Sequence, residues 1–189
     1  MGVMHEYHGC KEDQSRQGDG ANELQMKWQK PPAGHYKVNS DAACFKDGAV
    51  GFGGIMRDAE GDVMVATCHQ IGGGFTAEEA EALAARHALV IALEAGLRMI
   101  VLESDCLKLI SHLKEGKRDN SSFGNIVLDI MEIGESCTSL NFSHVSKIGN
   151  VVAHKLAQLS HSFGEMRVWI EEAPLEVMAD VRNDLFSDA

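Results

Sequence analysis

The sequence predicts an α/β domain whose five-stranded mixed sheet carries helices on both of its faces. Three observations support this prediction. Three strand-like segments joined by short turns come first in the globular part of the chain. A helical segment and a continuous apolar strand follow them. Two more helices, a further strand and a last helix complete the order βββαβααβα, which is typical of a three-layer α/β arrangement.

The first three strands are expected at residues 36–44, 49–57 and 63–71. In the first of them, YKVNSDAAC, alternate residues lie on opposite faces, so that Asn39 and Asp41 share a face. The connections KDG and DAEGD are short and rich in turn-forming residues. Because short turns join consecutive strands, we expect an antiparallel meander.

The chain then changes to helices and parallel strands. Residues 77–95 have apolar side chains at helical spacing. Residues 99–105, MIVLESD, form an apolar run that ends in charge, as in a strand buried on both faces. A right-handed crossover places this strand parallel to its sheet partner. The remaining elements are expected as helices at about 106–115, 122–136 and 150–163, and a strand at 138–145.

Three regions are expected along the chain. Residues 1–27 are polar without periodicity, which predicts a disordered N-terminus. The folded domain is expected at 28–164. Residues 165–189 form an acidic C-terminal extension, with an extended piece closed by Pro174 and then an amphipathic helix. This extension supplies much of the net charge of −11 and is a candidate surface for a protein partner.

Composition excludes several classes of protein. The five cysteines are widely spaced and form no CxxC pair, which argues against a disulfide scaffold and against a zinc site. No apolar stretch approaches the roughly 18–20 residues of a membrane span, and no membrane association is expected. We therefore expect an intracellular monomer, nuclear or cytoplasmic. Its acidic charge disfavours tight non-specific binding of nucleic acid.

Two aspartates have unusual positions for surface residues. Asp41 lies in the middle of a strand, where aspartate is depleted because it competes for backbone hydrogen bonds. Asp105 ends the apolar strand, at the edge where open α/β sheets bind ligands. Each also has a structural interpretation. A local salt bridge would account for Asp41, and an N-cap of the helix that begins CLKLI would account for Asp105.

The first helix contributes a third candidate. Thr76 and Glu79 have the spacing of a capping box, and Glu78 complements the helix dipole in the first turn. Glu81 has no such role and lies between two alanines, which would let another element approach closely. If Asp41, Glu81 and Asp105 converge, their charges favour bound Mg²⁺, as in a two-metal phosphodiesterase site.

Four segments then resemble one family in order and spacing. They are VNSDAA, AEALAARHAL, LESDCLKLI and HVSKIGNVVAHKLAQ. Together they resemble type 1 ribonuclease H, and more closely its plant branch, related to the RNase H domain of non-LTR retrotransposons. The flanking segments WQKPPAGHYKVN and VWIEEAP resemble the same branch, so that the likeness covers about residues 28–174. It implies an RNase H-like fold.

The resemblance also implies an activity, which is endonucleolytic cleavage of the RNA strand of an RNA–DNA hybrid. The family's metal-binding carboxylates fall on Asp41, Glu81 and Asp105, with Mg²⁺ as cofactor and Mn²⁺ as an alternative. The family's catalytic-loop histidine falls on His144, and His154 occupies the position of its fourth carboxylate. The implied nucleic-acid contacts are Asn39, Lys147 and Asn150.

His154 is the departure with the clearest chemical consequence. It lies off the apolar stripe of its helix, on the same polar face as Asn150. Imidazole is a poor ligand for Mg²⁺, so we expect a lower affinity for the second ion and reduced activity, or a preference for Mn²⁺. The alternatives are a non-catalytic RNase H-like module derived from a retroelement, which binds nucleic acid or protein, and a different metal-dependent nuclease on the same fold.

Overall fold

The computed structural model describes residues 27–117 and 119–186. Its elements are β1 (Tyr36–Cys44), β2 (Val50–Arg57), β3 (Val63–Ile71), α1 (Ala77–Glu94), β4 (Met99–Ser104), α2 (Leu107–Glu115), α3 (Ser122–Gly134), β5 (Ser139–His144), the 3-10 helix η2 (Lys147–Asn150), α4 (Val151–Phe163), β6 (Arg167–Ile170) and α5 (Leu175–Leu185). The predicted order is therefore present, followed by β6 and α5. Nearly all of the segment predicted to be disordered lies outside the described residues.

The sheet has six strands in the order β5-β4-β1-β2-β3-β6, one more than the sequence predicts. The meander β1-β2-β3 is antiparallel and β4 is parallel to β1, as expected. Strand β5 also pairs parallel with β4. The additional strand is β6, which pairs antiparallel with β3. Its four residues are too few for alternation to distinguish a strand from an extended tail, which is why the expected count of five was too low.

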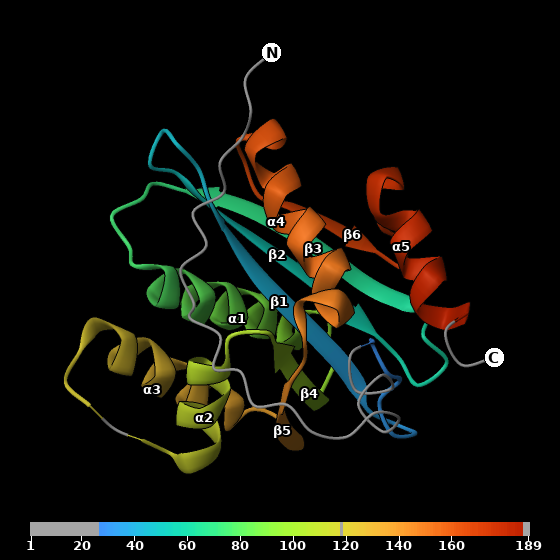
Figure 1. Ribbon diagram of the computed structural model, residues 1–189. Coiled ribbons are helices and arrows are strands. Elements are labelled where there is room, and N and C mark those ends of the chain that lie inside the picture. Colours follow the sequence, from blue (N-terminus) through green and yellow to red (C-terminus); the bar gives the residue numbers. More distant parts are fainter. Residues whose placement is uncertain (1–26, 118, 187–189) are drawn as a thin grey trace, which may run out of the picture.

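Helices cover both faces of the sheet (Figure 1). On one face α1 packs against the sheet, and α2 and α3 pack against α1 (Figure 1). On the other face α4 crosses β1, β2 and β3, and α5 packs beside α4. Within the described part of the chain, no helix is both long and apolar enough to cross a bilayer.

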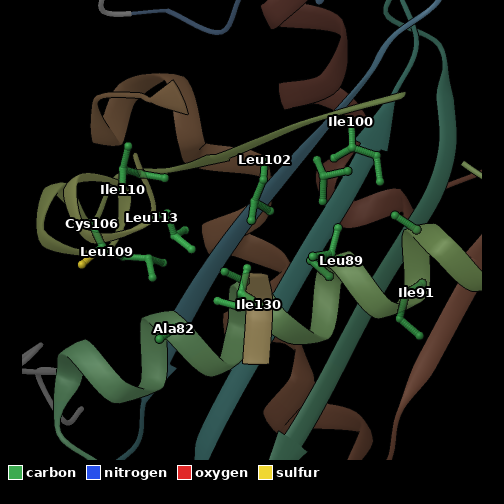
Figure 2. Packing of buried hydrophobic residues seen from close by; sticks show 14 of the residues in the cluster. Ala82, Leu89, Ile91, Ile100, Leu102, Cys106, Leu109, Ile110, Leu113 and Ile130 are labelled. Carbon is green, nitrogen blue, oxygen red and sulfur yellow. The ribbon is translucent and has the colours of Figure 1, made fainter. Parts of the chain in front are cut away.

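The main hydrophobic core lies on the α1 face. Figure 2 shows side chains of α1, β4, α2 and α3 that point toward one another, among them Leu89, Leu102, Leu109 and Ile130. Helix α1 begins with the predicted capping box between Thr76 and Glu79, in which each side chain accepts a hydrogen bond from the other's backbone N–H. Because the helix lies between the sheet and other helices, it buries more than the one predicted stripe.

Two glycines of β2 bring α4 close to the sheet on the opposite face. A Cβ atom at Gly53 would lie 2.2 Å from the carbonyl oxygen of Ala153 and 2.3 Å from the amide nitrogen of Ala157. At Gly51 it would lie 2.1 Å from Ser160 Oγ. Real Cβ atoms do not approach backbone so closely, so glycine at these positions is what permits the observed packing distance.

The C-terminal segment belongs to the same packed body. Val177 and Val181 of α5 are buried against Ile55 of β2 and Val152 of α4. Pro174 immediately precedes α5, in agreement with the expected extended piece and helix. Since β6 completes the sheet and α5 completes a hydrophobic cluster, the boundary expected at residue 164 does not separate two structural units.

A hydrogen-bond relay joins β6 to β3 and α1. The hydroxyl of Thr67 donates to the carbonyl oxygen of Arg167 at 3.0 Å, and its oxygen lies 3.0 Å from Nε2 of His87. Because the single hydroxyl proton goes to Arg167, Nε2–H of a neutral His87 must be the donor to Thr67. Burial, and then the charge of His69, lower the pKa of His87 to about 4.

Acidification should therefore destabilise the protein through His87. In the unfolded chain the pKa of histidine is near 6.5, so the unfolded state binds the proton first and stability falls as pH decreases from about 6.5 toward 4. Between pH 7.5 and 4.5 the loss attributable to this residue is about 2.5 kcal/mol. Urea unfolding at the two pH values should show this loss in the wild type relative to His87→Gln. The exposed His161→Gln is the matched control and should follow the wild type. Equal pH dependence of the wild type and His87→Gln would contradict the argument.

Candidate metal centre

Two aspartates lie just beyond the point where the parallel pairing of β1 with β4 ends. The pairing of β1 with β4 continues to Asn39 and Glu103. Asp41 and Asp105 each lie two residues beyond this pair, so they remain in register and project from the same face of the sheet. The side chain of Asp41 is buried, and Asp105 is half-buried. Asp105 is not a helix cap, because α2 has Cys106 at its N-cap position.

Helix α1 adds Glu81 to the two aspartates. One carboxylate oxygen from each of Asp41, Glu81 and Asp105 lies within 4.8 Å of the others. Glu78, three residues earlier, instead forms an ion pair with Lys108 of α2. The helix therefore directs Glu81, and not its neighbour, to the site, as the sequence predicts.

The electrostatics of the triad are unfavourable without a cation. Burial raises the pKa of Asp41 to about 6, and the charge of Asp105 contributes to this rise. Burial also raises the pKa of Glu81 well above its usual value, and the charges of Asp41 and Asp105 add to the effect. The pKa of Asp105 is raised by burial, although the nearby charge of Lys147 opposes the shift. The three carboxylates therefore resist being ionised at the same time. A bound cation would lower their pKa values and allow all three to be charged.

The donor set fits a hard divalent cation. Glu81 Oε2 is buried and has no hydrogen-bond partner among the residues that the structure describes. A buried carboxylate oxygen without a partner needs a compensating ligand. All three side chains offer oxygen, which Mg²⁺ and Mn²⁺ prefer. Asp41, Glu81 and Asp105 are therefore the residues that would hold such an ion.

His154 lies at the edge of this triad. Its Nδ1–H donates a 2.7 Å hydrogen bond to Asp41 Oδ2, and 45% of its side chain is exposed. The structure thus places His154 beside the carboxylates. In this arrangement Nδ1 acts as a hydrogen-bond donor to Asp41, which lowers the charge available to a cation at that oxygen.

Two other predicted residues lie near the triad. His144, exposed at the end of β5, donates from Nε2 to the backbone carbonyl oxygen of Asp105 at 3.2 Å. Lys147 is exposed in η2, and its charge acts on Asp105. Both side chains are accessible to a ligand that would approach the carboxylates from solvent.

Asn39 and Asn150 differ from their predicted role. Both are buried, with 1% and 2% exposure, so that their side chains do not reach a ligand at the surface. Asn39 Nδ2 donates to Asn150 Oδ1 at 3.2 Å, and Asn150 Nδ2 donates to the carbonyl oxygen of Ser40 at 2.9 Å. The expected nucleic-acid contact is therefore corrected to an internal network that connects the start of α4 with β1, directly beside Asp41.

Sequence reasoning missed the partners of this network. Trp28 Nε1 donates to Asn39 Oδ1 at 3.0 Å, and Asn39 Nδ2 also donates to Glu103 Oε1 at 2.9 Å. The guanidinium of Arg57 lies 3.6 Å from the centroid of the Trp28 ring. Two features of the sequence indicated buried polar partners. Asn39 lies on the same face of its strand as Asp41, and Glu103 is a charged residue within an apolar run.

Comparison with known proteins agrees with this geometry. The family model described as reverse transcriptase-like matches residues 39–160, which include all three carboxylates and His154. No curated protein matched the chain in a sequence comparison. Several solved structures share the fold.

RNase H1 from the halophilic archaeon Halobacterium salinarum NRC-1 aligns with a TM-score of 0.63 at 21% identity, over 68% of this chain and 98% of that one. LC11-RNase H1, solved in complex with an RNA/DNA hybrid, aligns with a TM-score of 0.61 at 18% identity, over 68% and 97%. The protease-reverse transcriptase of prototype foamy virus aligns with a TM-score of 0.51 at 17% identity, over 67% of this chain and 20% of that one. These structural likenesses establish the RNase H fold, and the match over residues 39–160 shows that the chain belongs to the reverse transcriptase-like family.

Proposed function

We propose that this protein is a metal-dependent ribonuclease that cleaves the RNA strand of RNA–DNA hybrids. The observation that carries the proposal is the convergence of Asp41, Glu81 and Asp105 just beyond the end of the parallel pairing between β1 and β4. The hybrid bound to LC11-RNase H1, which shares the fold, supports the substrate class. Recognition of the 2′-hydroxyl would let the protein distinguish RNA from DNA.

The three carboxylates would hold two divalent ions, Mg²⁺ or Mn²⁺. When bound, such ions supply an activated water and stabilise the charge of the leaving oxygen. The side chains of Asp41, Glu81 and Asp105 fix where this chemistry occurs, since Asp41 lies in β1, Glu81 lies in α1 and Asp105 directly follows β4.

The surrounding residues bind and orient the substrate. Lys147 is exposed beside Asp105 and supplies positive charge for a phosphate. His144, near the same aspartate, is placed to exchange protons with solvent or with the departing product. His154 donates a hydrogen bond to Asp41 Oδ2. We infer that the site binds a second ion less tightly than a site with four carboxylates would, and therefore expect slower turnover or a preference for Mn²⁺.

The same hydrogen bond favours a second candidate function. With Asp41 engaged by His154, the protein would be a non-catalytic RNase H-like module that keeps the fold and binds nucleic acid or protein. In either case we infer an origin in a retroelement of the plant branch and an intracellular monomer. The acidic residues at the C-terminal end would then form the surface for any protein partner.

Cleavage of labelled duplexes tests the proposal. An end-labelled RNA–DNA hybrid should be cut in its RNA strand in Mg²⁺ and faster in Mn²⁺, and not in EDTA. Matched RNA–RNA and DNA–DNA duplexes should remain intact. The isosteric Glu81→Gln variant should abolish cutting, because it removes a ligand charge at a buried position. No cutting in either ion by folded protein would favour the non-catalytic module. Cutting that survives Glu81→Gln would contradict the assignment of this site.

A further inference from the structure

A buried polar layer lies on the α4 face of the sheet, beside the carboxylate triad. On most sheets this position would be filled by hydrophobic side chains. Here it contains the nearly inaccessible side chains of Lys37, Asn39, Arg57, Glu103 and Asn150. Trp28, itself 2% exposed, contributes its ring to the layer. Buried polar groups of this kind are costly unless each is held by partners, so the contacts define a rigid arrangement.

The layer begins at the C-terminal helix. Asp184 of α5 accepts a 2.7 Å hydrogen bond from Arg57 Nη1, and the two form an ion pair. Arg57 is 1% exposed, and its Nε has no partner within the described residues. Asp184 is the carboxylate that neutralises this guanidinium. The central carbon of the guanidinium in turn lies 3.6 Å from the centroid of the Trp28 ring.

From Trp28 the contacts continue to the start of α4. The indole N–H donates to Asn39, and the Asn39 amide donates to both Glu103 and Asn150. Glu103 is also neutralised by Lys37 at 3.1 Å. The Asn39 side chain therefore accepts a hydrogen bond from the indole through Oδ1 and donates from Nδ2 to Glu103 and Asn150. Its orientation consequently depends on where the indole lies.

The network ends at the triad. Asn150 is the residue before α4, and its amide donates to the carbonyl oxygen of Ser40, next to Asp41 in β1. His154 follows one turn later and donates to Asp41 Oδ2. The Asn150 hydrogen bonds therefore help to set the register between α4 and β1, and with it the position of His154 relative to Asp41.

We propose that α5 is part of the apparatus that positions the metal centre, with Asp184 as a positioning residue that acts through Arg57, Trp28 and the two buried asparagines. This inference rests on the proposed function only in that the triad binds a divalent ion. Removing the charge of Asp184 deprives the buried guanidinium of Arg57 of its ion-pair partner, so it would move toward water and release the indole. Groups that orient metal ligands in this way typically alter metal affinity when mutated.

The chain offers a matched pair of variants for the test. Asp184→Asn removes the charge that faces Arg57. Asp180→Asn removes the same charge from the same helix, but its ion-pair partner is Lys155 of α4, at 2.6 Å, and not Arg57. Both variants alter net charge equally, so that long-range electrostatic effects on cation binding cancel in the comparison. Asp184→Glu keeps the charge and serves as the conservative variant.

The measurement is Mn²⁺ binding to the full chain at neutral pH, without substrate. Asp184→Asn should weaken Mn²⁺ affinity about tenfold, and Asp184→Glu should restore most of it. Asp180→Asn should stay within about twofold of wild type. Nuclear magnetic resonance gives a second readout, because the Trp28 indole N–H and the Asn150 side-chain amide should both shift in Asp184→Asn and remain in place in Asp180→Asn.

Each outcome has a distinct meaning. Equal Mn²⁺ affinity of Asp184→Asn and Asp180→Asn would overturn the proposal, as would unchanged Trp28 and Asn150 resonances in Asp184→Asn. If the wild type binds no Mn²⁺ while the resonances shift as expected, the positioning of α4 stands and the metal-dependent function fails. If the wild type binds Mn²⁺ and cuts hybrids but the two variants behave alike, the function stands and the role of α5 fails.

Discussion

The Asp41→Asn variant is expected to lose metal-dependent cleavage while its metal-free form becomes more stable than the wild type. Asp41 contributes one of the three carboxylates that converge at the site. Loss of a bound ion forfeits several kcal/mol of transition-state charge stabilisation, which corresponds to a rate decrease of about a thousandfold or more. The RNA–DNA hybrid assay in Mg²⁺ and Mn²⁺ measures this loss.

The gain in stability follows from the pKa of Asp41. Burial raises that pKa from 3.8 to about 6, so that ionising this group at neutral pH costs the folded state up to about 3 kcal/mol. The hydrogen bond from His154 opposes this rise, so its effect is already contained in that pKa. We therefore expect an increase of about 2–3 kcal/mol in the free energy of unfolding at pH 7.5.

The pH dependence has a definite sign. A carboxyl whose pKa is raised in the folded state binds its proton before the unfolded chain does, so its contribution to stability increases as pH falls from about 6 to 3.8. The difference between Asp41→Asn and the wild type should be largest at pH 7.5 and fall to about 1 kcal/mol at pH 4.5. Urea unfolding in EDTA at both values tests this. A variant less stable than the wild type at pH 7.5 would mean that the triad is not electrostatically strained.

The second large effect is expected on stability, from Gly53→Ala. The new Cβ atom would lie 2.2 Å from Ala153 O and 2.3 Å from Ala157 N, both of which are backbone atoms of α4. A flexible side chain cannot relieve this clash, so the helix itself must move. Overpacking of this kind costs about 3 kcal/mol. Because Gly53 pairs with Asp41 across the strands, the same displacement would separate His154 from Asp41.

Chemical denaturation and the hybrid assay together measure this prediction. Gly53→Ala should lower the free energy of unfolding and also reduce activity in the fraction that stays folded. Gly72→Ala is the matched control, because a Cβ atom at Gly72 meets nothing within 4 Å and its φ is ordinary. That variant should alter stability by less than about 0.5 kcal/mol. Similar unfolding midpoints for the two variants would contradict the close approach of α4.

Local patterns accounted for the elements and for the centre of the site. Alternation in YKVNSDAAC and the apolar run MIVLES predicted β1 and β4 because strand periodicity is a property of neighbouring residues. The capping box assigned Glu79 to the helix start, and Glu78 could be assigned to the helix dipole, which left Glu81 for the site. The family resemblance then placed the three carboxylates together, and the structure brings their oxygens within 4.8 Å.

Patterns failed where a residue's role depends on a distant partner. Asn39 and Asn150 have side chains of the kind that often contact ligands. They are 111 residues apart in sequence, and they form a hydrogen bond with each other in the interior. Arg57 has the appearance of an ordinary strand-end cation, yet it is buried against Asp184, 127 residues away. Strand β6 was missed because its four residues gain their structure from pairing with β3.

The sequence by itself determined the order of elements from β1 to α4 and the α/β class, since these depend on local periodicity and caps, and together with the family resemblance it indicated the three carboxylates. Only the tertiary structure decided that β6 and α5 complete the domain, that Gly51 and Gly53 let α4 approach the sheet, and that His154 donates to Asp41. The physical reason is that burial and hydrogen-bond satisfaction depend on which distant surfaces meet. The energy of a polar side chain such as Asn150 or Arg57 is therefore set by partners that no local window contains.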